Sequence, residues 1–177
     1  MLTGLNIGSG QRRFEDVSDI IKWWNIDCVT RPPDQIPDMV CDPQNERLPF
    51  NDESVNYCVL SQVYEHWGLG EGHGVVRECY RVLKPEGRMI VSVPDMKALA
   101  QRWLLGQIDD YIYFVNVYGA YQGEPGDRHK WGYSYQYLME DLRKAAPWHW
   151  MARVSKCDIP GIDIAFDWWI NVLEATK

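Results

Sequence analysis

Short apolar runs separated by clusters of small and polar residues give the chain its most regular pattern. In the first half these runs carry few charged side chains, as expected of strands that a parallel sheet buries on both faces. They span residues 1–7, 24–29, 38–41, 55–61 and 88–93. Between them, apolar residues at helical spacing predict helices over 11–22 and 75–84. The alternation of strands and helices predicts an α/β fold.

The second half continues this pattern around an aromatic insertion. Further helices are predicted over 96–105 and 134–146, and the last two strands over 151–156 and 168–175. Residues around 106–133 are rich in tyrosine, glycine and histidine. This insertion is either an irregular cover over the sheet or a substrate lid, because such folds place specificity elements there. We expect a single domain over residues 1–177.

Composition excludes several classes of protein. A length of 177 residues with 46% hydrophobic side chains suits one domain with a sizeable core. The net charge of −7 disfavours nucleic acid and anionic membranes as partners, since both would be repelled. No apolar run is long enough to span a membrane, and no signal peptide is visible. The five scattered cysteines show no zinc-binding spacing and are typical of reduced thiols in a cytoplasmic protein.

A glycine-spaced turn after the first strand is the first candidate for chemistry. In residues 5–10, LNIGSG, Gly8 lets the backbone turn, and Gly10 has no Cβ to keep a ligand away from main-chain N–H groups. Asp27 follows about 20 residues later, where nucleotide-binding βαβ units place an acid that binds ribose hydroxyls. These features alone permit a plain structural turn, a nicotinamide site or another nucleotide site.

An ordered set of sequence blocks narrows the choice. The chain resembles a class I S-adenosylmethionine-dependent methyltransferase of the type 11 group, and most resembles the small stand-alone enzymes often encoded beside glycan-synthesis genes. It departs from the family at Asn56, where an aspartate is usual, and at Glu86, which replaces the first of two glycines. The blocks are residues 5–10, Asp27, Asp42, 48–54, 64–66 and 81–87.

The resemblance implies a Rossmann-like sheet of seven strands, mostly parallel, flanked by helices, with the last strand antiparallel. It also implies S-adenosylmethionine as the cofactor. Gly8 and Gly10 would approach its methionine part, with Asn6 shaping the turn, and Asp27 would accept hydrogen bonds from both ribose hydroxyls. Asp42, or Asn45 in its place, would bind the adenine amino group. Ser61 and Gln62 are plausible neighbours of the methionine part or ordinary polar residues at a strand end.

On the acceptor side, His66 is the candidate general base, because an imidazole can take a proton near neutral pH. Its alternative is a structural bond to a backbone carbonyl, and Glu65 is a weaker candidate. His129 and Trp131 resemble a short family motif and suit a polar substrate. Alternatively, Trp131 fills the core and His129 caps the next helix. Methyl transfer requires no metal, and we expect none.

Three functions compete at this stage. The favoured one is methyl transfer to a small polar acceptor, such as a saccharide hydroxyl, in a monomer or a homodimer. A nicotinamide-dependent oxidoreductase is disfavoured, because Arg13 stands where a third glycine is expected. A non-catalytic binding or scaffold protein is the third, since only four residues precede Leu5 and many relatives carry a helical lid there.

Overall fold

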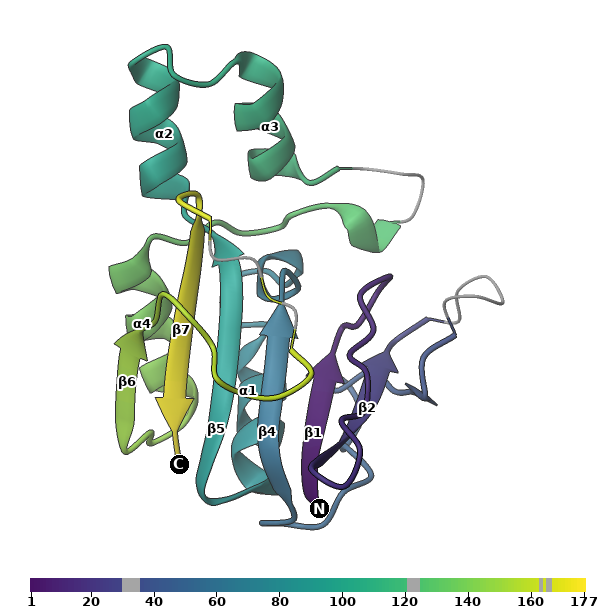
Figure 1. The fold of residues 1–177 in the computed structure, drawn as a ribbon. Coiled ribbons are helices and arrows are strands. Elements are labelled where there is room, and N and C mark those ends of the chain that lie inside the picture. The colour runs from purple at the N-terminus through teal and green to yellow at the C-terminus, as the bar shows by residue number, and fades with distance from the viewer. Residues whose placement is uncertain (30–35, 121–124, 163, 165–166) are drawn as a thin grey trace.

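The computed structural model describes residues 1–29, 36–120, 125–162, 164 and 167–177. Its centre is a seven-stranded sheet in the order β3-β2-β1-β4-β5-β7-β6 (Figure 1). The strands are β1 (Leu2–Ile7), β2 (Ile21–Asp27), β3 (Met39–Val40), β4 (Val55–Ser61), β5 (Leu83–Pro94), β6 (Trp150–Arg153) and β7 (Ile170–Thr176). Among the strands of the described residues, β7 alone runs opposite to the others and pairs antiparallel with β5 and β6. The predicted fold class and the antiparallel last strand are confirmed.

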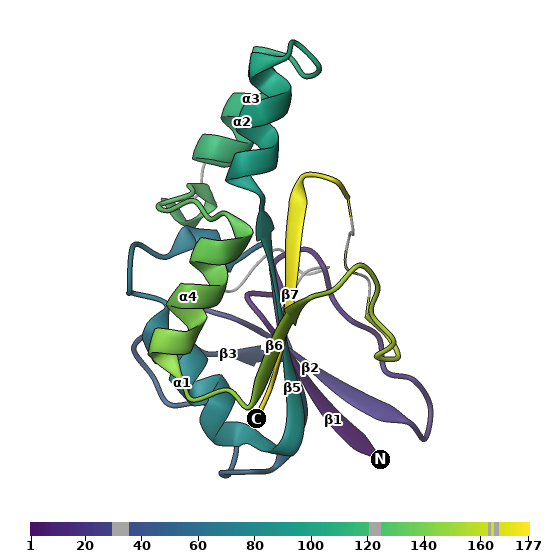
Figure 2. The ribbon, with the colours of Figure 1, turned by 90° about the vertical axis from the view of Figure 1, so that its left-hand side faces the viewer.

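The helices differ in their position relative to this sheet. They are η1 (Tyr64–His66), α1 (His73–Val82), α2 (Met96–Leu104), α3 (Asp110–Tyr118), η2 (Pro125–Asp127) and α4 (Tyr135–Ala145). Seen edge-on in Figure 2, α1 and α4 lie on the same side of the sheet. The pair α2 and α3 projects beyond the carboxyl ends of the parallel strands (Figure 1). The insertion therefore contains a helix, α3, and its residues 121–124 lie outside the described part of the chain.

Two clusters of buried hydrophobic residues pack on the two faces of the sheet. The larger cluster lies under the helices and includes Val76 and Cys79 of α1 and Leu138 of α4. The smaller cluster lies on the other face, where Phe14 and Ile159 come from connecting segments. Burial of apolar surface on both faces explains why the strand sequences are nearly continuous apolar runs.

The helix predicted over 11–22 is wrong. Residues 12–16 form no regular structure, and β2 already begins at Ile21. Asn25 accepts a hydrogen bond from the backbone N–H of Phe14, and Asp16 accepts one from that of Trp23. These side chains hold the segment along the edge of β2, and such bonds compete with the hydrogen bonds of a helix.

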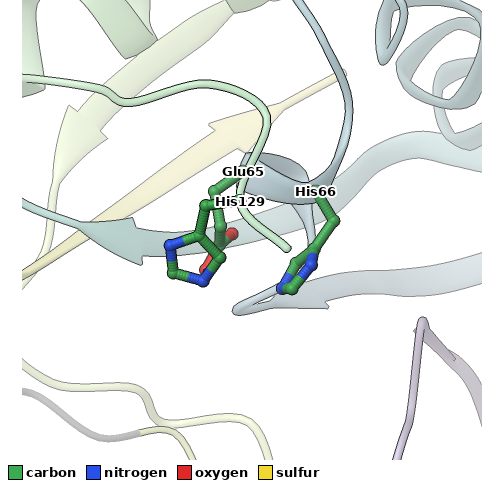
Figure 3. Close-up of side chains that lie close together, drawn as sticks. All are labelled: Glu65, His66 and His129. Carbon is green, nitrogen blue, oxygen red and sulfur yellow. The ribbon is translucent and has the colours of Figure 1, made fainter. Parts of the chain in front are cut away.

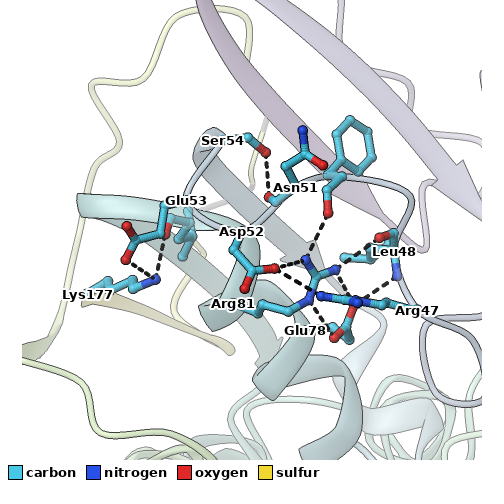
Figure 4. A network of polar contacts seen from close by, with 11 residues as sticks. Arg47, Leu48, Asn51, Asp52, Glu53, Ser54, Glu78, Arg81 and Lys177 are labelled. Atoms are coloured by element: carbon cyan, nitrogen blue, oxygen red, sulfur yellow. Dashed lines mark hydrogen bonds and ion pairs between the residues drawn. The ribbon is translucent and has the colours of Figure 1, made fainter.

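Arg81 joins two of the blocks on which the family resemblance rests (Figure 4). From the last turn of α1, its guanidinium donates to the carbonyls of Leu48 and Phe50 and to the carboxylates of Asp52 and Glu78. The loop before β4 is thereby fixed against α1. Because β4 leads directly into η1, this network also fixes the start of the candidate site.

No helix within the described ranges is both long and apolar enough to cross a bilayer. All five cysteines are free thiols, and Cys28 alone among them is exposed.

An irregular stretch near the start of β5, where its pairing with β4 shifts register, offers a stability test. Glu86 is exposed and has a φ of +63°, a left-handed conformation that costs a non-glycine residue about 1 kcal/mol. Glu86→Gly should therefore raise the free energy of unfolding by up to about 1 kcal/mol, measured by urea denaturation. Glu140→Gly, at an exposed position inside α4, is the matched control and should lower it by about 1 kcal/mol. A lower stability of Glu86→Gly would contradict the strain.

Candidate functional site

The turn after β1 is bent by two glycines in the left-handed region, with φ of +67° at Gly8 and +51° at Gly10. A Cβ on Gly8 would lie 2.3 Å from a methyl carbon of Val63, so this turn packs directly against the segment that leaves β4. A Cβ on Gly10 would meet nothing closer than the Gly8 carbonyl at 4.0 Å. Gly8 is therefore required by packing and by conformation, whereas Gly10 leaves its side of the turn open.

Asp27 lies at the end of β2, next to this turn. Its Oδ2 accepts a hydrogen bond of 2.8 Å from the backbone N–H of Gly10, and its Oδ1 accepts one of 3.2 Å from Val29. Parallel pairing of β1 with β2 places Ile7 beside Ile26 and so brings the two strand ends together. The structure thus joins the glycine turn and the acid that the sequence spacing paired.

Asn6 supports the turn from inside the protein. Its side chain is 2% exposed and donates to the carbonyl of Arg12 at 2.7 Å and to Oδ1 of Asn25 at 2.9 Å. These two bonds hold the connection between β1 and β2 in place.

The next strand end carries the predicted adenine-binding residues. Asp42 accepts bonds from the backbone N–H of Gln44 at 3.1 Å and from Nδ2 of Asn45 at 2.7 Å. The two candidates for the adenine contact are therefore neighbours rather than alternatives in separate places. The Cys41 N–H donates to the Asp27 carbonyl, which aligns the ends of β2 and β3.

Two buried polar atoms at the ends of β1 and β4 lack partners among the described residues: Oγ of Ser9 and Nε2 of Gln62. Gln62 has a φ of +54°, and Ser61 accepts a hydrogen bond from Ser92 at 3.2 Å. Buried polar groups are normally hydrogen-bonded, and exceptions need an explanation such as a ligand. These atoms lie beside Gly8 and Gly10, so the open side of the turn fits a polar nucleoside cofactor.

Beyond Val63, the structure brings together Glu65, His66 and His129 (Figure 3). One ligand-type atom from each residue lies within 4.8 Å of the others, and Nε2 of His129 is 3.9 Å from Oε1 of Glu65. The imidazole rings meet edge to face, with centroids 4.8 Å apart. This cluster could hold a metal ion or a polar acceptor.

The fold fixes the cluster from both sides. The Tyr64 hydroxyl donates to buried Asp141 of α4, whose other oxygen contacts Nε2 of His73 at 2.9 Å. From the other side, the N–H of Lys130 donates to the Glu65 carbonyl, which holds the segment after η2 across η1. The sequence analysis missed Asp141 and His73, since nothing in their spacing linked them to the site.

Burial shifts the pKa of all three side chains toward the neutral form. Glu65 is 1% exposed, and burial raises the pKa of its carboxyl to about 8. Burial lowers the pKa of His66, while the carbonyls of Gly126 and Arg128 oppose that change. The pKa of His129 is also lowered by burial, against the Asn116 carbonyl.

The alternative roles predicted for Trp131, filling the core, and for His129, capping the next helix, are both wrong. Trp131 is 38% exposed and does not fill the core. Helix α4 is capped by Ser134, whose side chain accepts from the Tyr137 N–H, and not by His129. His129 instead faces Glu65, which the sequence analysis had ranked below His66.

Comparison with known proteins finds a family match over part of the sequence and solved structures that share the fold. Residues 27–91, just over a third of the chain, match a family described as a methyltransferase domain. No significantly similar sequence occurs among curated proteins. The domain match and the fold together support an enzyme of the methyltransferase class.

Solved structures share the whole fold at low sequence identity. An S-adenosylmethionine-dependent methyltransferase from Archaeoglobus fulgidus is 13% identical with a TM-score of 0.61, covering 99% of this chain and 86% of that one. A possible histamine N-methyltransferase from Thermotoga maritima is 20% identical with a TM-score of 0.60, covering 99% and 82%. The Burkholderia thailandensis 1,6-didemethyltoxoflavin-N1-methyltransferase, solved with bound S-adenosylhomocysteine, is 16% identical with a TM-score of 0.57, covering 99% and 70%.

The buried carboxyl of Glu65 predicts an unusual pH dependence of stability. Its pKa rises from 4.5 to about 8 on folding, so folding favours the protonated form and stability is lost as the pH rises from 4.5 to 8. Relative to wild type, Glu65→Gln should gain on the order of 4 kcal/mol across that range. Chemical denaturation at several pH values with a chelator present measures this, and Glu140→Gln gives the baseline. Parallel pH profiles for wild type and Glu65→Gln would contradict the assigned pKa.

Proposed function

We propose that the protein is an S-adenosylmethionine-dependent methyltransferase that methylates a hydroxyl group of a small polar acceptor, with saccharides as the first class to test. One observation carries this proposal: Gly8, in the turn whose Gly10 is bonded to Asp27, packs on Val63, and Glu65 follows Val63 by two residues. A donor site and an acceptor site must be adjacent for methyl transfer. The methyltransferase domain match and the shared fold support the reaction type.

The cofactor would lie along the ends of β1, β2 and β4. S-adenosylmethionine supplies a methyl group activated by a positively charged sulfur. On this proposal Asp27 accepts hydrogen bonds from the ribose hydroxyls, and Asp42 accepts one from the adenine amino group. Ser9 and Gln62 offer buried polar atoms that have no other partner in the described part of the chain.

The acceptor would bind against Glu65, His66 and His129. A hydroxyl oxygen that forms a bond to carbon must give up its proton, and a positioned side chain can take it. In both histidines Nδ1 faces a backbone carbonyl, Gly126 for His66 at 2.6 Å and Asn116 for His129 at 2.8 Å. A neutral ring in that position keeps its proton on Nδ1, so its lone pair is on Nε2.

The saccharide assignment rests on the sequence resemblance and on the chemistry of the surrounding surface. The exposed ring of Trp131 offers a flat apolar surface, and the adjacent Lys130 offers a cation. Two of the solved structures named above are described as N-methyltransferases and the third carries no acceptor in its description, so they do not supply this acceptor class.

Both alternative functions lose support from the structure. A dinucleotide pyrophosphate sits at the N-terminus of the helix after the glycine turn, and here residues 12–16 form no helix. Arg13, which follows that turn, pairs with Asp38 on the β3 side. A purely structural protein would gain nothing from a buried carboxyl without a hydrogen-bond partner among the described residues.

Cofactor binding tests the role of Asp27. Calorimetry should show S-adenosylhomocysteine binding at micromolar strength, with no competition from NAD. Asp27→Ala should lose on the order of 2 kcal/mol of that affinity, because a charge-assisted pair of hydrogen bonds is removed.

A double-mutant cycle separates this contact from damage to the turn. Asp27→Ala also loses the bond to the Gly10 N–H, so each protein is titrated with the ligand and with its 2′,3′-dideoxy analogue. Wild type should prefer the hydroxylated ligand, and Asp27→Ala should not. An equal preference in both proteins would remove Asp27 from the ribose site, and tight binding of NAD alone would overturn the proposed function.

His66 should affect turnover without affecting the donor. His66→Gln should lower kcat by about a hundredfold or more, because deprotonation of the acceptor is impaired. Its affinity for S-adenosylhomocysteine should match wild type. The rate of methyl transfer to a panel of saccharides, measured against pH, gives kcat. Calorimetry gives the affinity for S-adenosylhomocysteine. Unchanged kcat and an identical pH profile would reject a catalytic role for His66.

A further inference from the structure

We propose that Glu65, His66 and His129 form a binding site for one divalent transition-metal ion, and that this ion binds and acidifies the acceptor hydroxyl. The metal site stands on the geometry alone, whereas its use in methyl transfer rests on the proposed function. The sequence analysis expected no metal, because methyl transfer does not require one.

The ligand types and their orientation suit such an ion. Two imidazoles and one carboxylate are a common set for zinc, iron and manganese, and they leave coordination positions open. The carbonyls of Gly126 and Asn116 each face Nδ1 of a ring, the arrangement that orients metal-binding histidines in proteins. Each ring thus presents Nε2 as its coordinating nitrogen.

The distances are those of a loosely assembled site. Ligand atoms about 2.1 Å from a shared ion lie roughly 3–3.5 Å from each other. His129 Nε2 and Glu65 Oε1 are 3.9 Å apart, and the whole set lies within 4.8 Å. Binding therefore requires a contraction of roughly 0.5 Å for the Glu65–His129 pair and of up to about 1.8 Å for the widest pair, and we expect side-chain rotation to supply most of it.

Glu65 points to the ion most directly. Both of its oxygens are buried, and neither has a hydrogen-bond partner among the described residues. An ionised carboxylate in that position is costly unless a cation compensates it. The imidazoles of His66 and His129 lie close to it, and they are neutral when they offer Nε2. A divalent ion between them would supply the missing positive charge.

The position of the site explains what the ion would do. The Glu65 cluster begins two residues after Val63, which packs against the glycine turn. The ion would hold the Nε2 lone pair of His66, so on this inference His66 acts as a ligand instead of as the general base. An acceptor hydroxyl on the ion would lose its proton to solvent water more readily, since a bound cation lowers the pKa of an oxygen ligand. The resulting oxygen anion would stand next to the proposed methyl donor.

Metal titration of chelator-treated protein tests the site without any activity assay. Isothermal titration with Zn²⁺ and Mn²⁺ should show one equivalent bound at micromolar strength or tighter for at least one of the two ions. Co²⁺ bound to wild type should give visible absorption that Zn²⁺ removes. Glu65→Gln and His129→Gln should each weaken binding at least about tenfold. His149→Gln, at an exposed histidine outside the cluster, is the matched control and should bind as wild type does.

The outcomes separate the two proposals. Absence of stoichiometric binding to wild type, or binding that only His149→Gln weakens, would overturn the metal site. If a variant fails to fold in the chelator, the Co²⁺ spectrum of wild type decides, because histidine ligation changes its visible bands. Binding of S-adenosylhomocysteine is measured on the same sample. If the sample binds S-adenosylhomocysteine but no metal, only the proposed metal site is refuted. If it binds metal but not S-adenosylhomocysteine, only the proposed methyltransferase function is refuted.

Discussion

The packing of Gly8 against Val63 is the contact on which the rest of the site depends. The turn after β1 and the segment after β4 belong to adjacent strands, but adjacency alone leaves room for a side chain between them. Because Gly8 has no Cβ, its backbone lies directly against the Val63 side chain. The proposed donor and acceptor sites are therefore linked through Val63, and a residue larger than glycine at position 8 would have to displace that side chain.

Around this contact the protein keeps polar groups buried at a cost in stability. Ser9, Gln62 and Glu65 all hold buried atoms that lack hydrogen-bond partners in the described residues, and all three lie at the ends of β1 and β4. A sheet held between two hydrophobic clusters can tolerate such a cost. The concentration of these atoms at one edge is typical of a site whose ligands complete the hydrogen bonding.

Rigid supports hold that edge in position. Arg81 fixes the loop before β4, and Asp141 fixes η1 through Tyr64. The segment that carries His129 is held by two backbone hydrogen bonds. The Lys130 N–H donates to the Glu65 carbonyl, and the Tyr133 carbonyl accepts from the Met96 N–H. Helices α2 and α3 lie between Met96 and the segment that carries His129 in the chain. They project past the strand ends, where an acceptor would approach (Figure 1).

The sequence by itself determined the strands, the order of blocks and the pairing of the glycine turn with Asp27. These follow from local rules: apolar runs form buried strands, and parallel strand ends meet at one edge. The helix predicted over residues 11–22 does not form. The apolar spacing there could not indicate that Asn25 and Asp16 would bind backbone N–H groups and keep the segment extended. Only the tertiary structure placed His129 on Glu65, since residues that far apart in the chain meet through packing and not through any periodic pattern.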